Sequence, residues 1–248
     1  MMEKSVIEGL FETMLVVGGR IVLESEHYVR MADAVRQIGA DELDAELWRD
    51  ALRAALRSVG NEGEHSLRSI YQRGSGGAWT LSAEAFDLPK VTLRRRRHGR
   101  ATILPPAIRR HAPAIKSLDW LVEIRLLRAT LAEDVDEGLL VDDDGKILEG
   151  TSTNVFAIDG DTLLTPPLDA GILPGTVRNW VIRNAPRVGL SVRHRGLARE
   201  DLMKGSFRTS SLSRLSPIRA IDGTPTSDPG ERFHELAELF DTEMVKQR

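Results

Sequence analysis

Cysteine is absent from the 248 residues, which excludes a disulfide framework and any thiolate metal site. No run of about 18 apolar residues occurs, so we expect no segment to span a bilayer. The first residues also lack the apolar stretch of a signal peptide. Positive charge is not in surplus, since 34 Lys and Arg stand against 37 Asp and Glu, which argues against a surface built for nucleic acid. With 41% hydrophobic and 29% charged residues, the sequence is typical of a soluble, cytoplasmic globular protein.

The first part of the chain predicts a small α+β domain over residues 1–104. Alternating and helical hydrophobic patterns predict strands at 10–17, 20–23, 65–72 and 90–96, and helices around 28–38 and 43–56. We expect Asp41 to cap the second helix and Gly60 to end it.

Prolines at positions 105, 106 and 113 predict an extended linker over 105–113. A larger C-terminal domain is then expected over 114–248. Its predicted elements are a helix at 118–133, hairpins at 138–148 and 153–165, a helix that opens at Pro174 and stops before Pro186, and a last helix that Asp228 caps with Pro229 in its first position. The elements lack a regular βαβ rhythm, so two α+β domains are favoured over a doubly wound fold.

Three motifs suggest functions that their surroundings do not support. The run 234–238 resembles a zinc-protease helix but ends in Glu where a second His is required, and no metal site is expected. The glycine-rich run 73–77 lacks the Gly-Lys-Ser/Thr of a phosphate-binding Walker loop and is either a hairpin loop or a substrate contact. The arginines 94–97 lack interleaved aromatic residues, so a solvated edge strand is favoured over a nucleic-acid patch.

Four separate segments fit one kind of chemistry. Lys116 follows the proline linker, where clefts form between domains, although a single lysine is usually a surface residue. Glu149 precedes a predicted strand, and the run 173–178 opens a helix whose free N–H groups are suited to a phosphate. The run 209–212 adds hydroxyl donors on another turn.

The run from Glu149 to Arg178, together with Lys116, resembles the signature of the fold type IV pyridoxal-phosphate (PLP) enzymes, the class IV aminotransferase family. This family includes branched-chain and D-amino acid aminotransferases and aminodeoxychorismate lyase. The resemblance implies a two-domain α+β fold, with a smaller N-terminal domain, a C-terminal domain built on a β-barrel-like sheet, and PLP at the domain interface. It also implies a homodimer that acts on a small-molecule amino substrate. Family members carry a longer segment before the residues that match Gly9–Glu12, so the resemblance implies either an open sheet edge here or a pocket wall that a partner subunit supplies in part.

The resemblance assigns roles to particular residues. Lys116 is the catalytic residue, which holds the cofactor as a Schiff base and then carries the proton. Glu149 is the anionic partner of the pyridine nitrogen. The remaining residues assigned to the cofactor are Arg30, Asn154, Thr176, Val177 and Ser211.

The substrate pocket departs from the patterns of the individual activities. Phe11 stands where D-amino acid aminotransferases have a tyrosine, and Ala78-Trp79-Thr80 replaces their arginine and histidine. Trp120 stands near the position of a tyrosine in branched-chain aminotransferases. Phe11, Trp79 and Trp120 are therefore the candidate pocket walls, and the residues that receive the substrate carboxylate stay open.

The motifs favour a lyase but leave alternatives. The runs 73–77 and 210–212 resemble aminodeoxychorismate lyase, which forms 4-aminobenzoate and pyruvate for folate biosynthesis, whereas 115–118 and 149–156 resemble D-amino acid aminotransferases. The leading hypothesis is a lyase. A transaminase acting on D-amino acids or (R)-amines with a 2-oxo acid acceptor is the alternative, and a PLP-binding protein without catalytic activity is the second.

Overall fold

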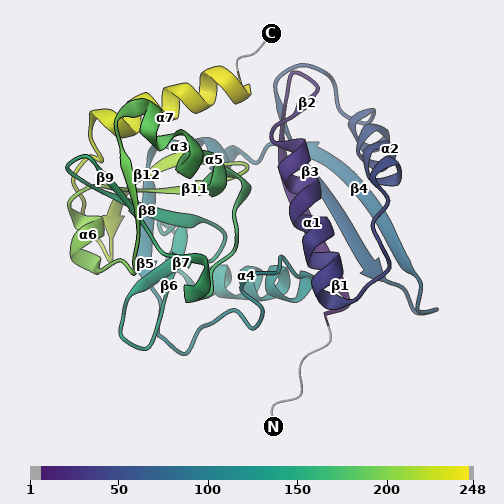
Figure 1. The fold of residues 1–248 in the computed structure, drawn as a ribbon, viewed down its shortest axis with the longest axis horizontal. Coiled ribbons are helices and arrows are strands. Elements are labelled where there is room, and N and C mark those ends of the chain that lie inside the picture. Colours follow the sequence, from purple (N-terminus) through teal and green to yellow (C-terminus); the bar gives the residue numbers. More distant parts are fainter. Residues whose placement is uncertain (1–6, 246–248) are drawn as a thin grey trace. The chain divides into compact units, whose positions relative to one another are not determined.

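The computed structural model describes residues 7–245, which form two compact units (Figure 1). The first unit contains the residues up to Leu88 together with Ile115–Arg125. The second contains Pro89–Ala114 and the chain from Leu126 onward. The chain is therefore a two-domain α+β protein. The expected boundary at 104 differs from this division, because residues 89–114 belong with the second unit.

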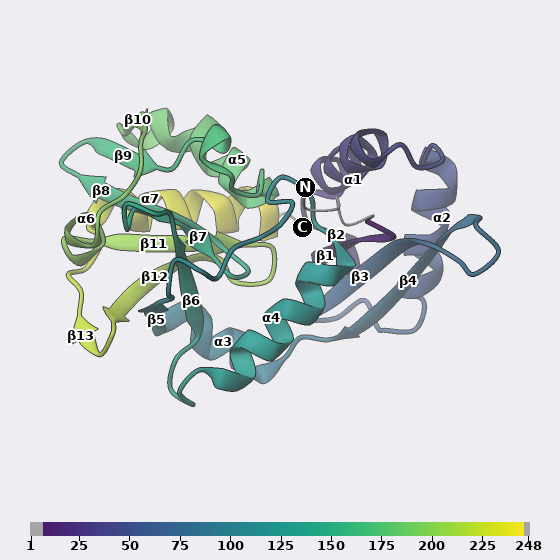
Figure 2. The ribbon, with the colours of Figure 1, turned by 90° about the horizontal axis from the view of Figure 1, so that it is seen from below.

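The first unit is built on an antiparallel sheet with the strand order β2-β1-β3-β4. The strands are β1 (Gly9–Val17), β2 (Arg20–Ile21), β3 (Glu64–Arg73) and β4 (Trp79–Asp87), and the helices are α1 (Glu24–Ile38) and α2 (Ala45–Leu56). Both helices lie over the same face of the sheet (Figure 2). Strand alternation explains why, since even-numbered residues of β1 and odd-numbered residues of β3 share the cluster that the helices cover.

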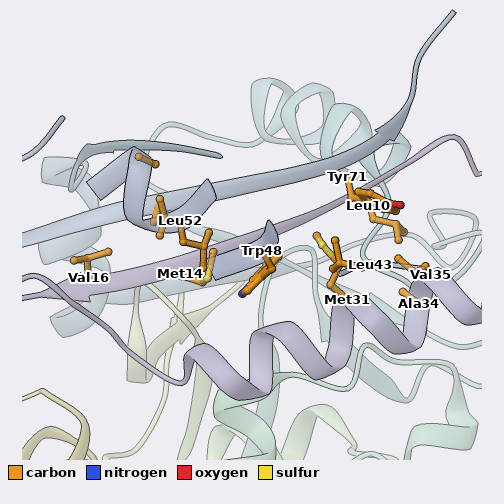
Figure 3. Packing of buried hydrophobic residues seen from close by; sticks show 12 residues of the cluster. Leu10, Met14, Val16, Met31, Ala34, Val35, Leu43, Trp48, Leu52 and Tyr71 are labelled. Atoms are coloured by element: carbon orange, nitrogen blue, oxygen red, sulfur yellow. The ribbon is translucent and has the colours of Figure 1, made fainter. Parts of the chain in front are cut away.

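The cluster between this sheet and its helices is the hydrophobic core of the first unit (Figure 3). Met14 and Leu67 come from the strands, Met31 from α1, and Trp48 and Leu52 from α2. Each of these side chains is at most 2% exposed. Burial of a Met or Leu side chain contributes roughly 1.5–3 kcal/mol, so this core holds β1 in place.

The second unit is built on a mixed sheet with the order β10-β9-β8-β11-β12-β5-β6-β7, and β13 pairs with β12. The strands are β5 (Gly99–Ile103), β6 (Glu137–Val141), β7 (Ile147–Gly150), β8 (Asn154–Asp159), β9 (Thr162–Thr165), β10 (Ser191–His194), β11 (Ser206–Ser210), β12 (Arg214–Ile221) and β13 (Thr224–Pro225). Only three residues join β7, at the end of this order, to β8 near its other end. A flat sheet would separate those strands by about 24 Å, beyond the reach of about 14 Å of so short a link. The sheet therefore curls.

Helices complete the second unit. They are α3 (Lys90–Arg97), α5 (Thr176–Asn184), α6 (Arg199–Met203) and α7 (Glu231–Phe240), with short helical turns at Leu168–Ala170, Ala185–Val188 and Asp241–Val245. Phe156 and Phe207 stack at 4.9 Å between ring centroids, and Phe233 of α7 packs on Phe207. The remaining helix, α4 (Leu118–Thr130), passes from the first unit into the second after Arg125.

The strand predicted at 90–96 is wrong, since these residues form the helix α3. Arginine and lysine are good helix formers, and the run has no alternation of polar and apolar residues. The arginines are also not a solvated edge. Arg94 pairs with Asp136, and Arg96 donates two hydrogen bonds to the carbonyl oxygen of Leu212.

Three helix ends differ from the prediction. Asp44, not Asp41, caps α2, because its carboxylate accepts the N–H groups of Glu46 and Leu47. The same helix ends at Leu56, before Gly60. The last helix begins at Glu231 after Gly230, so Asp228 and Pro229 precede it, and Asp228 instead accepts the Gly230 N–H. The other predicted helices and strands are confirmed within a few residues, although the strand at 20–23 is reduced to Arg20–Ile21.

Candidate functional site

Lys116 is fixed against β1 by its own backbone. Its carbonyl oxygen accepts the Phe11 N–H at 3.0 Å, and Ser117 forms a β-bridge with Leu10. The Nζ of Lys116 lies 4.2 Å from the centroid of the Phe11 ring. Phe11, an expected pocket wall, is therefore the direct neighbour of the expected catalytic amine.

Arg30 is held by a buried carboxylate of the same strand. Glu12 accepts the Nε of Arg30 at 2.8 Å and a terminal nitrogen of the guanidinium at 2.5 Å. His27, one turn before Arg30 on α1, places Nδ1 2.7 Å from the same carboxylate. Two parallel bonds from one guanidinium fix its plane as well as its position, so Glu12 orients Arg30.

The charges of this cluster are set by burial and pairing. Burial opposes ionisation of Glu12, but Arg30 and His27 outweigh it and lower the pKa of Glu12 to about 2. Burial lowers the pKa of His27, and the charges of Arg30 and Lys116 act in the same direction. At neutral pH the cluster is thus a carboxylate, a guanidinium and a neutral imidazole that donates Nδ1–H.

A second cationic group lies on the side of the sheet that Phe11 occupies. The guanidinium carbon of Arg68 on β3 is 6.0 Å from the centroid of the Phe11 ring. Burial lowers the pKa of Arg68, and the charge of Arg125 lowers it further. Two guanidinium groups within electrostatic range of one another favour an anionic partner.

The two tryptophans expected in the pocket lie in different surroundings. Trp79 stacks on Tyr71 at 5.2 Å between centroids, in the core that α1 and α2 cover. By strand register Phe11 lies on the opposite face, so Phe11 and Trp79 do not line one wall within this sheet. Trp120 is buried on α4, where its backbone N–H donates to the hydroxyl of Ser117.

Glu149, in the second unit, is a buried carboxylate with fixed donors. Arg110 donates to one oxygen at 2.9 Å, and the Leu173 N–H and the Asn154 side chain donate to the other at 3.0 and 3.3 Å. The Arg110 and Glu149 side chains are only 5% and 2% exposed. A carboxylate so enclosed is oriented to within a single rotamer, which suits it to recognise a cationic group.

The Glu149 cluster continues to the start of α5. Asn154 also donates to the Leu173 carbonyl oxygen at 2.9 Å. A Cβ on Gly175 would lie 2.0 Å from the Asn154 Oδ1, so only glycine fits beside that amide. Gly175 has no side chain to cap α5, and the first turn carries no acidic residue. The N–H groups of Thr176 and Val177 thus open a helix whose positive end is suited to an anion.

Arg178 is a buried cation in the first turns of α5. It is buried, and it donates to the Pro166 carbonyl oxygen at 2.8 Å. Burial lowers the pKa of Arg178 to about 10, although the charge of Glu149 acts in the opposite direction. Arg178 therefore adds positive charge behind the first turn of α5.

Ser211 lies in a tight turn between β11 and β12. Arg96 donates to the next carbonyl oxygen, that of Leu212, from Nε at 3.0 Å and from a terminal nitrogen at 2.8 Å. The Ser213 N–H donates to the Ser210 hydroxyl at 3.1 Å. Among the described residues, the buried hydroxyl of Thr209 has no hydrogen-bond partner. The turn thus presents hydroxyl groups from a backbone that Arg96 holds.

Within each unit the structure brings some of the expected residues together. Lys116 and Phe11 are neighbours in the first unit, and Glu149 and Asn154 are hydrogen-bonded in the second. The prediction missed the residues that hold Arg30, Glu149 and the Ser211 turn in place, namely Glu12, Arg110 and Arg96. Glu12 had a signal, because a carboxylate at a core position of a strand requires a buried partner, and the two arginines gave none.

Residues 7–245 contain neither a candidate metal site nor a candidate membrane-spanning helix. No group of His, Cys, Asp and Glu side chains there is arranged to hold a metal ion. Over the same residues, the longest apolar helical stretch is too short or too polar to cross a membrane.

Comparison with known proteins places these residues in a family. A curated relative from Mycobacterium tuberculosis, named as a bifunctional aminodeoxychorismate lyase and D-amino acid transaminase, is 32% identical over 97% of this chain and 91% of its own length. A solved structure of a hypothetical aminotransferase from that organism, in its PLP-bound form, superposes with a TM-score of 0.85 at 28% identity, over 97% of this chain and 90% of that one. A fold IV transaminase from Curtobacterium pusillum has a TM-score of 0.81 at 25% identity, over 95% and 86% of the two chains. The model of the amino-transferase class IV family matches residues 9–221, and the chain therefore belongs to this family of PLP-dependent enzymes.

Proposed function

We propose that the chain is an aminodeoxychorismate lyase that uses PLP to release 4-aminobenzoate and pyruvate from 4-amino-4-deoxychorismate. The relative named for both lyase and D-amino acid transaminase activity supports this reaction and also a second candidate, transamination of D-amino acids. The observation that supports the use of PLP is the enclosed Glu149 beside the start of α5, where Gly175 offers no side chain as a cap.

The residues present fit PLP by the chemistry of their donors. Glu149 is an anion suited to a protonated ring nitrogen. The start of α5 and the hydroxyl groups of the Ser211 turn are suited to a phosphate. The glycine at 175, where a Cβ would meet the Asn154 amide, is consistent with a close approach of backbone at this point.

Each residue is assigned one task toward the cofactor. Lys116 binds the cofactor aldehyde through Nζ, and Glu149 accepts the N–H of the pyridine ring. The phosphate is held by Arg30, by the N–H groups of Thr176 and Val177, and by the Ser211 hydroxyl. Asn154 acts through Glu149, whose carboxylate it orients.

PLP, when bound, supplies an electron sink for the carbon that bears the substrate amine. The Nζ of Lys116 would hold the cofactor aldehyde and, when free of it, would move protons to and from the reacting carbon of the substrate. Phe11 supports this role, because a neutral or cationic Nζ lies over its ring and is shielded from water on that side. The same proton transfer serves both candidate reactions.

Arg68 and Arg125 support an anionic substrate. Both candidate substrates, aminodeoxychorismate and a D-amino acid, carry carboxylates, and these arginines favour an anion near Phe11. Trp120 stays a candidate for the pocket wall. Trp79 contacts Tyr71 instead, so its role as a wall is the less supported of the two.

The test compares the two reactions in one preparation loaded with PLP. With aminodeoxychorismate, we expect 4-aminobenzoate and pyruvate to form in equal amounts. With D-alanine and 2-oxoglutarate, formation of D-glutamate would establish the transaminase, and transaminase activity without lyase products would replace the first candidate by the second. Stoichiometric binding of PLP with neither reaction would support a non-catalytic binding protein.

The variant Lys116→Ala tests the assignment of the catalytic residue. Loss of a residue that acts as nucleophile and proton carrier is expected to reduce turnover by roughly 10³-fold or more. The matched control is Lys146→Ala, which removes an exposed lysine of the β6–β7 turn and leaves turnover unchanged. Turnover within tenfold of the wild type in Lys116→Ala would contradict the mechanism.

A further inference from the structure

The second unit contains a buried cluster of charged side chains that the proposed reaction does not use. It lies at the start of β6, where Asp136 and Glu137 are each 1% exposed. Arg94 of α3 pairs with Asp136, and three further arginines lie close to the two acids, namely Arg95 of α3, Arg128 of α4 and Arg208 of β11. None of these residues is among those proposed to hold PLP.

The contacts connect the three arginines into one group. Arg208 donates to the backbone carbonyl oxygen of Arg95 at 3.1 Å and lies 3.7 Å from the Glu137 carboxylate. Glu137 accepts the Ser152 hydroxyl at 3.1 Å, and that hydroxyl accepts a hydrogen bond from Arg128 at 2.6 Å. Arg95, Arg208 and Arg128 are thus linked through Glu137 and Ser152.

The carboxylates of the cluster are engaged mainly by other groups. Asp136 accepts Arg94 at 2.7 Å and the Arg100 N–H at 3.1 Å, whereas its distance to the Nε of Arg95 is 3.5 Å. Glu137 is bound by the Thr151 and Ser152 hydroxyls, with Arg208 at 3.7 Å. Arg95 and Arg208 therefore make only long contacts with the two acids, beyond ordinary hydrogen-bond distance.

Unsatisfied donors face this group. Among the described residues, the Nε atoms of Arg95, Arg128 and Arg208 are all buried and have no hydrogen-bond partner. Arg208 is only 2% exposed, so bulk solvent does not reach its donors. A buried guanidinium without full pairing is costly, and three of them in one group require an acceptor.

The net charge of the cluster indicates the charge that a bound acceptor would have. Arg94, Arg95, Arg128 and Arg208 carry four positive charges, and Asp136 and Glu137 carry two negative charges. Burial is the main cause that lowers the pKa of both Arg95 and Arg208, and repulsion from neighbouring arginines lowers it further, against the attraction of Asp136 and Glu137. A bound anion would offset this repulsion.

We propose that Arg95, Arg128 and Arg208 form a binding site for a small oxyanion, a carboxylate or a phosphate. Planar guanidinium groups match the paired oxygens of both ligands. Arg95 and Arg128 are only partly buried and can be reached from solvent, whereas Arg208 is buried.

The experiment titrates the protein, saturated with PLP, with inorganic phosphate and separately with acetate. Sodium chloride keeps the ionic strength constant, so that general screening of the arginines does not register as binding. Calorimetry measures affinity and stoichiometry, and thermal unfolding measures the rise in Tm that a ligand specific to the native state produces. We expect one site per chain for phosphate, acetate or both, and the ligand that binds identifies the class.

Variants locate the site. Arg95→Gln and Arg128→Gln retain hydrogen-bonding side chains and are expected to weaken binding at least tenfold each. Arg232→Gln removes the same charge from an exposed pair on α7 and is expected to leave affinity unchanged. Arg208→Met is expected to abolish binding, and the two partly exposed variants decide the question if this buried change prevents folding.

The proposal is overturned by two outcomes. The first is that neither anion binds in the millimolar range, which would make the cluster a purely structural network. The second is equal affinity in the wild type, Arg95→Gln and Arg128→Gln. Both readouts are independent of turnover, so failure of the lyase reaction would leave this result intact.

Discussion

At the residue scale, a carboxylate inside the first unit couples the orientation of Arg30 to its own ionisation. Glu12 is 1% exposed and accepts two bonds from Arg30 and one from His27. The variant Glu12→Gln removes the anion and leaves Arg30 buried without its counterion. We expect the free energy of unfolding to fall by about 3–5 kcal/mol, the range for breaking a buried ion pair. Urea unfolding measures this loss, and a change below the error of the extrapolation would contradict the assigned pairing.

The same cluster predicts how stability depends on pH. The pKa of His27 is lowered in the folded state, so below pH 6.5 the unfolded chain binds this proton more readily and stability falls. The pKa of Glu12 falls from 4.5 to about 2, so its contribution is present above pH 4.5 and is lost as the pH falls toward 2. Both groups therefore destabilise the protein on the acid side.

Thermal unfolding between pH 8 and pH 4 measures this dependence. The matched variant is His27→Asn, whose amide replaces the Nδ1 donor without titrating. Its Tm is expected to vary less than that of the wild type between pH 6.5 and pH 5. Parallel curves of Tm against pH for the two proteins would show that protonation of His27 does not cause the loss of stability between pH 6.5 and pH 5.

Arg110 and Glu149 form the corresponding buried pair of the second unit. Arg110→Met leaves the carboxylate without its cation and is expected to destabilise the protein without PLP by about 3–5 kcal/mol. The double variant Arg110→Met, Glu149→Gln removes both charges and is expected to recover part of this loss. Additive losses in this double-mutant cycle, measured by urea unfolding, would mean that the two side chains do not interact.

At the scale of elements, the start of α5 depends on a residue without a side chain. Gly175→Ala places a Cβ 2.0 Å from the Asn154 Oδ1 and must displace the amide that orients Glu149. We expect the dissociation constant of PLP to rise by about 10–100-fold, as for loss of a residue that orients a ligand. Gly76→Ala is the control, because its Cβ meets no atom within 4 Å. Absorbance titration with PLP measures both, and equal affinities would contradict the role of the close contact.

Local sequence patterns predict most of the helices and strands. Residues 10–17 are mostly apolar and end at Gly18-Gly19, and Pro174-Gly175 opens a helix, so β1 and α5 were predictable. The helix α3 was missed although its arginines favour a helix, and the partners of those arginines, such as Asp136 and Leu212, lie too far along the chain for the sequence to show them. The predicted cap at Asp41 failed for a smaller reason, since Asp44 offers the same chemistry one turn later.

At the scale of the whole molecule, long-range pairing decides what the sequence cannot show. β5 pairs in parallel with both β12 and β6, and its pairing with β12 joins residues more than a hundred positions apart. This pairing explains why residues 89–114 belong to the second unit, although the prolines at 105 and 106 suggested a boundary. Only those candidate site residues that belong to a sequence motif were predictable. Lys116 and Glu149 match the family pattern, whereas Arg110 and Arg96 are identified only by the contacts that they make in the structure.

A homodimer remains a prediction at this scale, and α4 offers a surface to test it. Val122 and Leu126 lie one turn apart on this helix and are 56% and 66% exposed. Neighbouring exposed apolar side chains favour a protein partner over water, and a second copy of the chain is the partner that the family implies.

Sedimentation of the wild type is expected to give twice the mass of the chain. The double variant Val122→Glu, Leu126→Glu would place carboxylates in the interface, and we expect the dimer dissociation constant to rise by more than about tenfold, or about 1.4 kcal/mol. Leu47→Glu is the control, because Leu47 is an exposed apolar residue of α2 in a different surrounding. A dimer that resists the α4 variant would place the interface on another face, whereas a monomeric wild type would contradict the dimer itself, because exposed Val122 and Leu126 would then be stable in water without a partner.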